Sequence, residues 1–245
     1  MKNLYIVIAA IGLATQATAA PLDDATRSRI DGLVDRQAPA ITSNALAIWN
    51  LAEPGFRETQ SSALLQATLK KAGFTIESGI AGMPTAFVAR YRTGPGPVIA
   101  HLAEFDALPG ITQDSVATSP KPIPGVGAGH ACGHNLLGAA AVGSAIAVRQ
   151  WMEQSGFKGE IRVYGAPAEE GGDGKAYMVR DGRFGDVDIV LHWHPADRNM
   201  VLDRPTLANI KTDFTFHGVS SHAAAAPERG RSALADAALQ LLDGG

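Results

Sequence analysis

The feature that most constrains the fold is a repeated change in hydrophobic period along the chain. Apolar residues recur at helical spacing in some stretches, and other stretches are short β-type runs separated by Gly and Pro. The helical spacing predicts helices over 23–51 (broken near Pro39), 59–72, 135–151 and 175–181. The β-type runs predict strands over 74–77, 85–91, 97–102, 160–164 and 188–192. This alternation indicates an α/β domain whose sheet is covered by helices.

The N-terminus has the pattern of a secretory signal peptide. A basic start at Lys2 precedes an apolar run over 4–14 and small residues up to Ala20, which predicts a signal peptide over 1–20 cleaved after Ala19 or Ala20. The apolar run is too short to span a bilayer, and no later stretch is long enough. We therefore expect a secreted or periplasmic protein. The alternative is an uncleaved N-terminal anchor.

Composition excludes several classes of protein. Cys132 is the only cysteine, so no internal disulfide is possible and stability must come from a hydrophobic core. Hydrophobic residues make up 46% of the chain, charged residues 18%, and the net charge is −3. The charges are interspersed and form no basic patch. We expect a globular enzyme with neither a nucleic acid nor a membrane as its partner.

The hydrophobic pattern changes after Pro205. A long β-type run over 207–217 is followed by a polar loop and a predicted helix over 229–242. We place a domain boundary there, with a first domain over 21–205 and a partial second domain over 206–245. A lone strand and helix cannot bury a core. We therefore expect the chain to be incomplete at its C-terminus or to be completed by another chain.

Metal-ligating side chains gather in the predicted loops, mostly just after strands. Cys132 and His134 occupy a glycine-lined turn; the other groups lie in 101–110, 167–172 and 192–195. In α/β proteins the loops at strand ends carry the functional groups. One thiol, several imidazoles and paired carboxylates are the set that a two-metal hydrolytic site requires. The alternative is that Cys132 is an ordinary buried thiol and that the histidines are turn residues.

The adjacent pair Glu169 and Glu170 lies between an apolar strand and two glycines. The glycines allow a sharp turn that aims the two carboxylates in different directions. One can then bind metal while its neighbour takes a proton from a metal-activated water. The alternative for such a pair is a solvated surface.

Four motifs taken together resemble a known family. AEFDALPG, GHACGHN, PAEEGGDGK and HWHP resemble the zinc-type metallopeptidase and amidohydrolase family that includes aminoacylase and carboxypeptidase G, and among its members most closely the aminobenzoyl-glutamate utilization protein B type. The likeness extends from about residue 24 to residue 245. It implies a zinc-peptidase-like catalytic domain with a central mixed sheet flanked by helices, followed by the start of an inserted α+β lid or dimerisation domain.

The resemblance also implies roles for individual residues. Two divalent ions, Zn or Mn, would be held by Cys132, His134, Glu170 and His194. Glu169 resembles the general base, and Asp106 the aspartate that orients the site. For the histidine ligand after the fifth strand, His192 is the alternative to His194. His101 and His130 are expected to be supporting or structural residues.

The second domain carries one more candidate. His222, in the stretch 218–223, resembles the lid histidine that reaches the active site of a partner subunit and polarises the scissile carbonyl, which implies a homodimer formed through the lid. The alternative is a polar loop histidine without a role. The family takes a final histidine ligand from a segment after the lid, and this sequence contains no such segment.

The resemblance implies a metal-dependent hydrolase. We expect it to cleave an amide bond in a small N-acyl or aminobenzoyl amino acid by attack of metal-bound water, with Glu169 as base. Two alternatives stay open: a dipeptidase or carboxypeptidase of the same family, and a shortened, inactive remnant that binds metal only.

Overall fold

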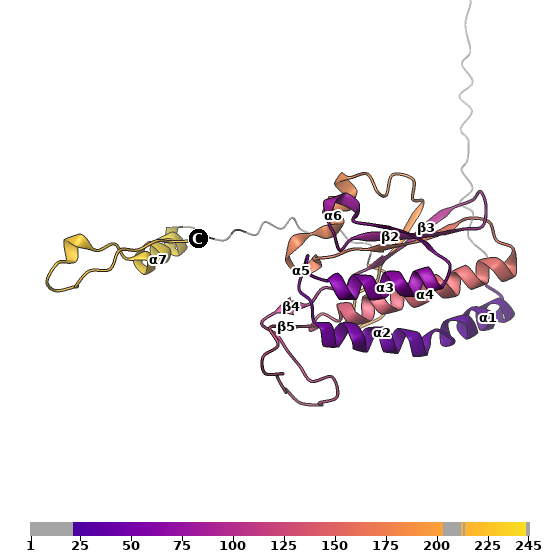
Figure 1. Cartoon of the computed structure of the whole chain (residues 1–245), viewed down its shortest axis with the longest axis horizontal. Helices are drawn as coiled ribbons and strands as arrows, with labels where there is room; N and C mark the ends of the chain where they lie inside the picture. Colours follow the sequence, from indigo (N-terminus) through magenta and orange to yellow (C-terminus); the bar gives the residue numbers. More distant parts are fainter. Residues whose placement is uncertain (1–21, 203–211, 213, 244–245) are drawn as a thin grey trace, which may run out of the picture. The chain divides into compact units, whose positions relative to one another are not determined.

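A computed structural model describes residues 22–202, 212 and 214–243 of the chain (Figure 1). The chain divides into two compact units, Met1–Asp197 and Arg198–Gly245, which are described separately below. The predicted signal peptide over 1–20 and the predicted domain boundary near Pro205 lie outside the described residues.

The first unit is built on a mixed five-stranded sheet, as the resemblance implied. Its strand order is β1-β2-β6-β3-β7. The strands are β1 (Thr75–Ser78), β2 (Phe87–Arg92), β6 (Glu160–Gly165), β3 (Val98–Ala103) and β7 (Ile189–Leu191). β6 pairs antiparallel with β2 and parallel with β3, and β3 pairs parallel with β7. β4 (Leu108–Pro109) and β5 (Ala128–Gly129) form a separate antiparallel pair.

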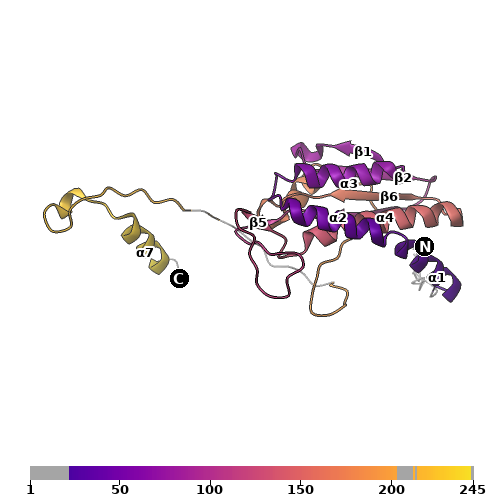
Figure 2. The same cartoon turned by 60° about the horizontal axis from the view of Figure 1, so that its bottom comes forward.

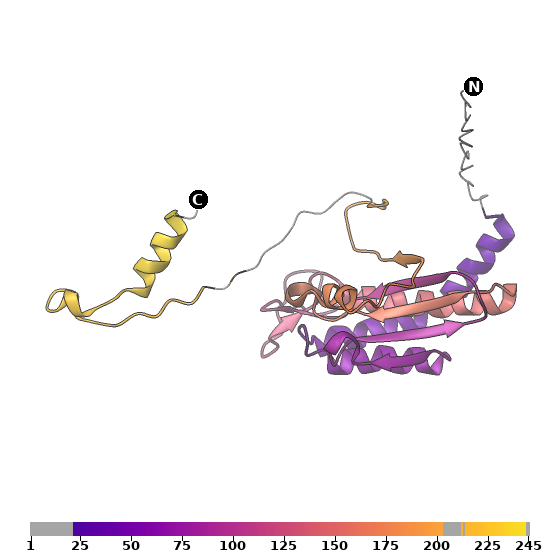
Figure 3. The ribbon, with the colours of Figure 1, turned by 90° about the horizontal axis from the view of Figure 1, so that it is seen from above.

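Helices cover both faces of this sheet. The helices on one face are α2 (Ala38–Leu51), α3 (Thr59–Lys71) and α4 (His134–Ser155), with α1 (Asp24–Asp35) packed on α4 (Figure 2). The short helices α5 (Glu169–Gly172) and α6 (Gly174–Arg180) follow β6, and α6 packs on the opposite face (Figure 3). The 3-10 turn η1 (Ile80–Gly82) lies between β1 and β2.

The strand periodicity produces two hydrophobic cores. In β2, Phe87 and Ala89 point into the core beneath α3 and α4, whereas Val88 points into the core beneath α6. In β6, Val163 and Tyr164 divide between the same two cores. Successive strand residues point to opposite faces, so short apolar runs of this kind can fill both cores.

The predicted elements match the observed ones closely. Pro39 lies in the first turn of α2, where a proline fits because that amide has no helical partner. α4 runs to Ser155, four residues further than expected, and ends at Gly156, which has a φ of 72°. Glycine adopts this left-handed conformation without strain, so the helix stops there. No helix among the described residues is long and apolar enough to cross a membrane.

The second unit contains less regular structure than the sequence pattern predicted. The expected strand over 207–217 is wrong for its described residues, 212 and 214–217, which form no strand. In the described part of this unit the one β-bridge joins Val219 to Arg231. The helix α7 (Ala233–Asp243) begins four residues later than expected, because Pro227–Arg229 forms the 3-10 turn η2.

Candidate metal centre

The candidate site lies where the parallel strands β3, β6 and β7 end. Because these strands run in the same direction, the loops that follow them emerge at one edge of the sheet. The loops carry Asp106, the pair Glu169 and Glu170, and His194. The N-terminus of α4 adds His134 to the same edge, with Cys132 in the turn before it.

Asp106 joins two of these loops. His134 Nδ1 lies 2.8 Å from Asp106 Oδ1, and the backbone amide of Glu170 donates to Asp106 Oδ2 at 2.9 Å. Asp106 and His134 are each 1% exposed, so this contact is shielded from water. A carboxylate on one imidazole nitrogen fixes the ring and directs the other nitrogen toward a ligand. Asp106 therefore holds His134 Nε2 in a set orientation toward the site.

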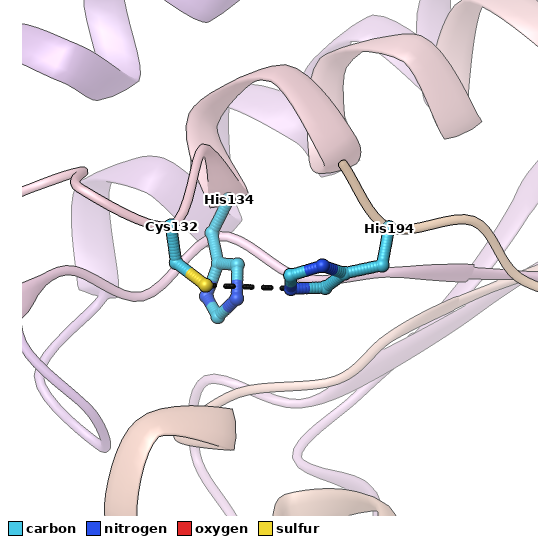
Figure 4. A group of neighbouring side chains, drawn as sticks. All are labelled: Cys132, His134 and His194. Carbon is cyan, nitrogen blue, oxygen red and sulfur yellow. Dashed lines mark hydrogen bonds between the residues drawn. The ribbon is translucent and has the colours of Figure 1, made fainter. Parts of the chain in front are cut away.

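Two overlapping sets of potential ligands share His134. Cys132, His134 and His194 form one set, with Cys132 Sγ 3.3 Å from His194 Nε2 (Figure 4). His134, Glu169 and Glu170 form the other, and the ligand atoms of each set lie within 4.8 Å of one another. His134 Nε2 is 3.8 Å from both Glu169 Oε2 and Glu170 Oε1.

Unsatisfied polar atoms indicate that the site fits a cation. His134 Nε2, Glu170 Oε1 and Glu104 Oε2 are buried and form no hydrogen bond, although Glu104 Oε2 lies only 3.2 Å from His134 Nε2. Buried polar atoms in folded proteins are almost always paired, so unpaired ones that converge on a point need an explanation. A thiol, two imidazoles and carboxylates are together suited to a borderline divalent ion such as zinc.

The ionisation of Cys132 agrees with this fit. Burial, together with the negative charges of Glu170 and Glu169, raises the pKa of the Cys132 thiol to about 11. Part of this shift thus comes from carboxylates that crowd around the thiol. A divalent cation among these ligands would supply an opposing positive charge.

The structure adds Glu104, which the sequence pattern did not single out. Its side chain is 1% exposed, and its Oε2 lies 3.2 Å from His134 Nε2. Its Oε1 contacts Lys175 Nζ and lies 3.1 Å from His192 Nε2. Although burial alone would raise the pKa of Glu104, His192 and Lys175 lower it to about 2. Its position directly after β3 was the signal that could have identified it.

The structure separates the competing histidines. His194 lies beside Cys132, whereas His192 contacts Glu104. His130 is buried, and its Nε2 lies 3.1 Å from the carbonyl oxygen of Ile48, which agrees with a structural role.

The predicted catalytic His222 belongs to the second unit. Its Nδ1 accepts hydrogen bonds from the amides of Ala224 and Ala225 at 3.2 and 3.1 Å. Its role in catalysis stays a prediction.

Comparison with known proteins assigns the family. The model of Peptidase family M20/M25/M40 matches residues 100–244, a segment that contains every predicted metal ligand. The chain belongs to this family. The resemblance drawn from the four motifs is thereby confirmed.

Three relatives show how far the likeness extends. A p-aminobenzoyl-glutamate hydrolase subunit of Escherichia coli (strain K12) is 44% identical over 205 residues, which cover 84% of this chain and 42% of that protein. The Xaa-Arg dipeptidase of Mus musculus is 31% identical, covering 84% of this chain and 46% of that protein. A dinuclear metal-binding peptidase of the M20 family from Bacillus subtilis has 25% sequence identity and a TM-score of 0.50, covering 70% of this chain and 44% of that one. The chain thus spans less than half the length of these relatives.

Proposed function

We propose that this protein is a metal-dependent hydrolase that cleaves an amide bond in a small N-acyl or aminobenzoyl amino acid. The observation that carries the proposal is the convergence of Cys132, His134, Glu170 and His194 around unpaired, buried ligand atoms, with Glu169 at their edge. The M20-family solved structure described as dinuclear supports two ions in such a site. We propose Zn or Mn as the metal, on the basis of the ligand types.

In this proposal the residues divide into holding and proton-transferring groups. When bound, a divalent ion supplies a Lewis acid for the amide carbonyl and for water. Asp106 fixes the His134 ring through the 2.8 Å contact. The same aspartate positions Glu170 by accepting its backbone amide. The Glu169 side chain is 39% exposed and so is accessible to substrate. It accepts the proton of the attacking water and delivers it to the leaving amine.

The similarity to the p-aminobenzoyl-glutamate hydrolase of Escherichia coli favours an aminobenzoyl amino acid as substrate. The Xaa-Arg dipeptidase relative supports a second candidate, hydrolysis of a dipeptide, more weakly, because its identity is 31% against 44%. Both reactions need the same attack on an amide carbonyl. They differ only in the groups on either side of it.

The test is a substrate panel with metal analysis. Purified protein loaded with Zn²⁺ or Mn²⁺ is assayed on p-aminobenzoyl-glutamate, N-acyl amino acids and Xaa-Arg dipeptides, and bound metal is counted. We expect two ions per chain and highest turnover on p-aminobenzoyl-glutamate, with activity abolished in Glu169→Ala. Equal turnover by Glu169→Ala would refute the role of the base. Preference for dipeptides would favour the second candidate, and absence of bound metal would favour an inactive remnant.

We further propose that the protein is exported and forms a homodimer through residues 206–245, with His222 acting on the partner's substrate. The N-terminal sequence pattern and the resemblance of the segment around His222 to the family's lid motif support these points. N-terminal sequencing of the mature protein tests export, with Pro21 or Ala20 as the expected first residue. Sedimentation of the full chain and of a chain ending at Pro205 tests the dimer, which the shorter chain should not form.

A further inference from the structure

The turn that carries Glu169 and Glu170 begins in a strained backbone conformation. Ala168 has φ 57° and ψ 41°, in the left-handed region that residues with a Cβ rarely adopt. Such a residue persists only where its surroundings hold it. Because Glu169 is the next residue, the direction of its side chain depends on what holds Ala168.

A buried carboxylate from a distant part of the chain holds this residue. Glu58 is 0% exposed, and its Oε1 accepts the backbone amide of Ala168 at 2.8 Å. Its Oε2 accepts the Thr85 hydroxyl at 3.0 Å. The two contacts fix the carboxylate from both sides.

Glu58 is itself anchored to a regular element. It is the N-cap residue of α3, and its carbonyl oxygen accepts the amide of Ser62 at 2.9 Å. Movement of its backbone would therefore disturb the first turn of α3. The carboxylate links the Ala168 turn to the N-terminus of that helix.

The segment before Glu58 packs directly on the same turn. A Cβ on Gly55 would lie 2.9 Å from Ala168 Cβ, and a Cβ on Gly172 would lie 2.8 Å from that atom. No real Cβ is found so close to another carbon, so both glycines are needed for this approach. Phe56 lies against Gly172 from the same side. The turn is thus confined by packing as well as by the hydrogen bond.

We infer that Glu58 is a positioning residue of the candidate metal centre: its carboxylate holds Ala168 in the left-handed conformation that aims Glu169 and Glu170 at His134. It acts through the backbone of the turn and touches neither metal nor substrate. The catalytic part of this inference rests on the proposed function. The structural part, that Glu58 holds the turn, does not.

Two substitutions separate reach from charge. Glu58→Asp keeps the charge but shortens the side chain by about 1.5 Å, one carbon–carbon bond, so that it no longer reaches the Ala168 amide. Glu58→Gln loses the charge but keeps the reach, since its carbonyl oxygen can accept from Ala168 while its amide group donates to the Thr85 hydroxyl. A positioning role predicts that Glu58→Asp loosens the Ala168 turn and that Glu58→Gln leaves it intact.

Glu53→Asp is the matched control. Glu53 lies in the same loop, and its carboxylate accepts the amides of Gln60 and Ser61 at 3.0 and 2.8 Å. Shortening it weakens the start of α3 without changing the contact between Glu58 and Ala168. This control therefore reports what a purely structural loss in this loop does.

The measurements are hydrogen exchange of the peptide covering 166–172, Mn²⁺ titration calorimetry, and turnover of p-aminobenzoyl-glutamate. In Glu58→Asp we expect faster exchange in that peptide, metal binding weaker by about tenfold or more, and a lower kcat at unchanged KM. Glu58→Gln should match the wild type. Glu53→Asp should melt at a lower temperature but keep wild-type exchange at 166–172 and wild-type metal binding.

The inference is overturned if Glu58→Gln shows faster exchange and weaker metal binding while Glu58→Asp behaves as wild type, or if the two variants behave alike. It is also overturned if Glu53→Asp shows the same local losses. If the wild type neither binds Mn²⁺ nor turns over substrate, the proposed function fails, and the exchange measurement still decides whether Glu58 holds the turn.

If Glu58→Asp does not fold, Thr85→Val replaces it, because it removes the hydroxyl that fixes Oε2. Unchanged exchange at 166–172 in that variant contradicts the inference.

Discussion

Asp106 contacts His134 through one carboxylate oxygen and the backbone of Glu170 through the other, at 2.8 and 2.9 Å. One buried side chain therefore sets the positions of two candidate ligands that come from different elements. The orientation of the ligands depends on a residue that does not itself face the site's unpaired atoms.

Replacing Asp106 should weaken metal binding while the protein stays folded. Asp106→Asn cannot accept from both His134 and Glu170 as the carboxylate does, so we expect an affinity loss of about 10- to 100-fold for Zn²⁺ or Mn²⁺, the usual range for such supporting groups. Calorimetric titration measures it, with circular dichroism to check the fold. Asp114→Asn, in an exposed loop, is the control and should bind metal normally. Wild-type affinity in Asp106→Asn would contradict the orienting role.

The adjacent glutamates should differ in what they control. Glu170→Gln removes a ligand, and we expect it to lower the number of ions bound per chain. Glu169→Gln should keep wild-type metal content but lose about 10²- to 10⁴-fold in kcat, because it removes the proton acceptor. Metal analysis and kinetics on the same preparations check both. Loss of metal in Glu169→Gln would reverse the assignment.

Cys132 should set which metals bind best. A thiolate favours soft and borderline ions, whereas a hydroxyl does not. We expect Cys132→Ser to lose more affinity for Cd²⁺ and Zn²⁺ than for Mn²⁺, as measured by competition titrations. Equal losses for all three ions would indicate that the sulfur lies outside the coordination shell.

An ion pair between the buried Arg162 and the exposed carboxylate of Asp186 should contribute to stability in acid. Arg162, 5% exposed, forms a two-point contact with Asp186, and its hydrogen bonds lower the pKa of that carboxyl from 3.8 to about 2. A lowered carboxyl pKa contributes stability that is complete above the unfolded value and is lost as the pH falls from about 4 toward 2. Urea unfolding across that range should show a smaller pH dependence in Asp186→Asn. Asp35→Asn, at the exposed end of α1, should behave as wild type.

Two helical glycines should respond oppositely to alanine. A Cβ on Gly138 of α4 would lie 2.5 Å from the carbonyl oxygen of Glu104, so Gly138→Ala should cost about 1–3 kcal/mol of unfolding free energy. Gly32 of α1 has only Arg36 Nη1 nearby, at 3.8 Å, so Gly32→Ala should gain up to about 1 kcal/mol. Thermal melting of the two variants checks the signs. If both variants are destabilised, the room available for the added Cβ does not decide the effect.

Local sequence pattern was enough to locate the elements but not their pairing. Alternating apolar residues identified the strand at 160–164, yet its antiparallel contact with β2 and parallel contact with β3 depend on chain direction in space. Residues 212 and 214–217, the described part of the strand expected over 207–217, show the converse limit. A β-type run needs a partner strand, and hydropathy alone does not supply one.

The sequence pattern could single out candidate site residues that lie shortly after strands, such as Asp106, Glu169 and His194. Glu104 lies in the same motif as Asp106 and directly follows β3, but the resemblance assigns it no role. Glu58 could not have been found this way. It lies 110 residues from Ala168 in sequence, and an acid before a helix usually indicates only a helix N-terminus.

The candidate ligands are dispersed along the chain, so a bound ion would stabilise the folded protein as a whole. Cys132 and His194 are 62 residues apart in sequence, and an unfolded chain cannot hold both near one ion. An ion that joins them would act as a reversible cross-link between distant loops, adding about 2.7 kcal/mol at a free concentration of one hundred times Kd. A chelator would then lower the free energy of unfolding as well as the activity, and metal-depleted protein would open more often to proteases.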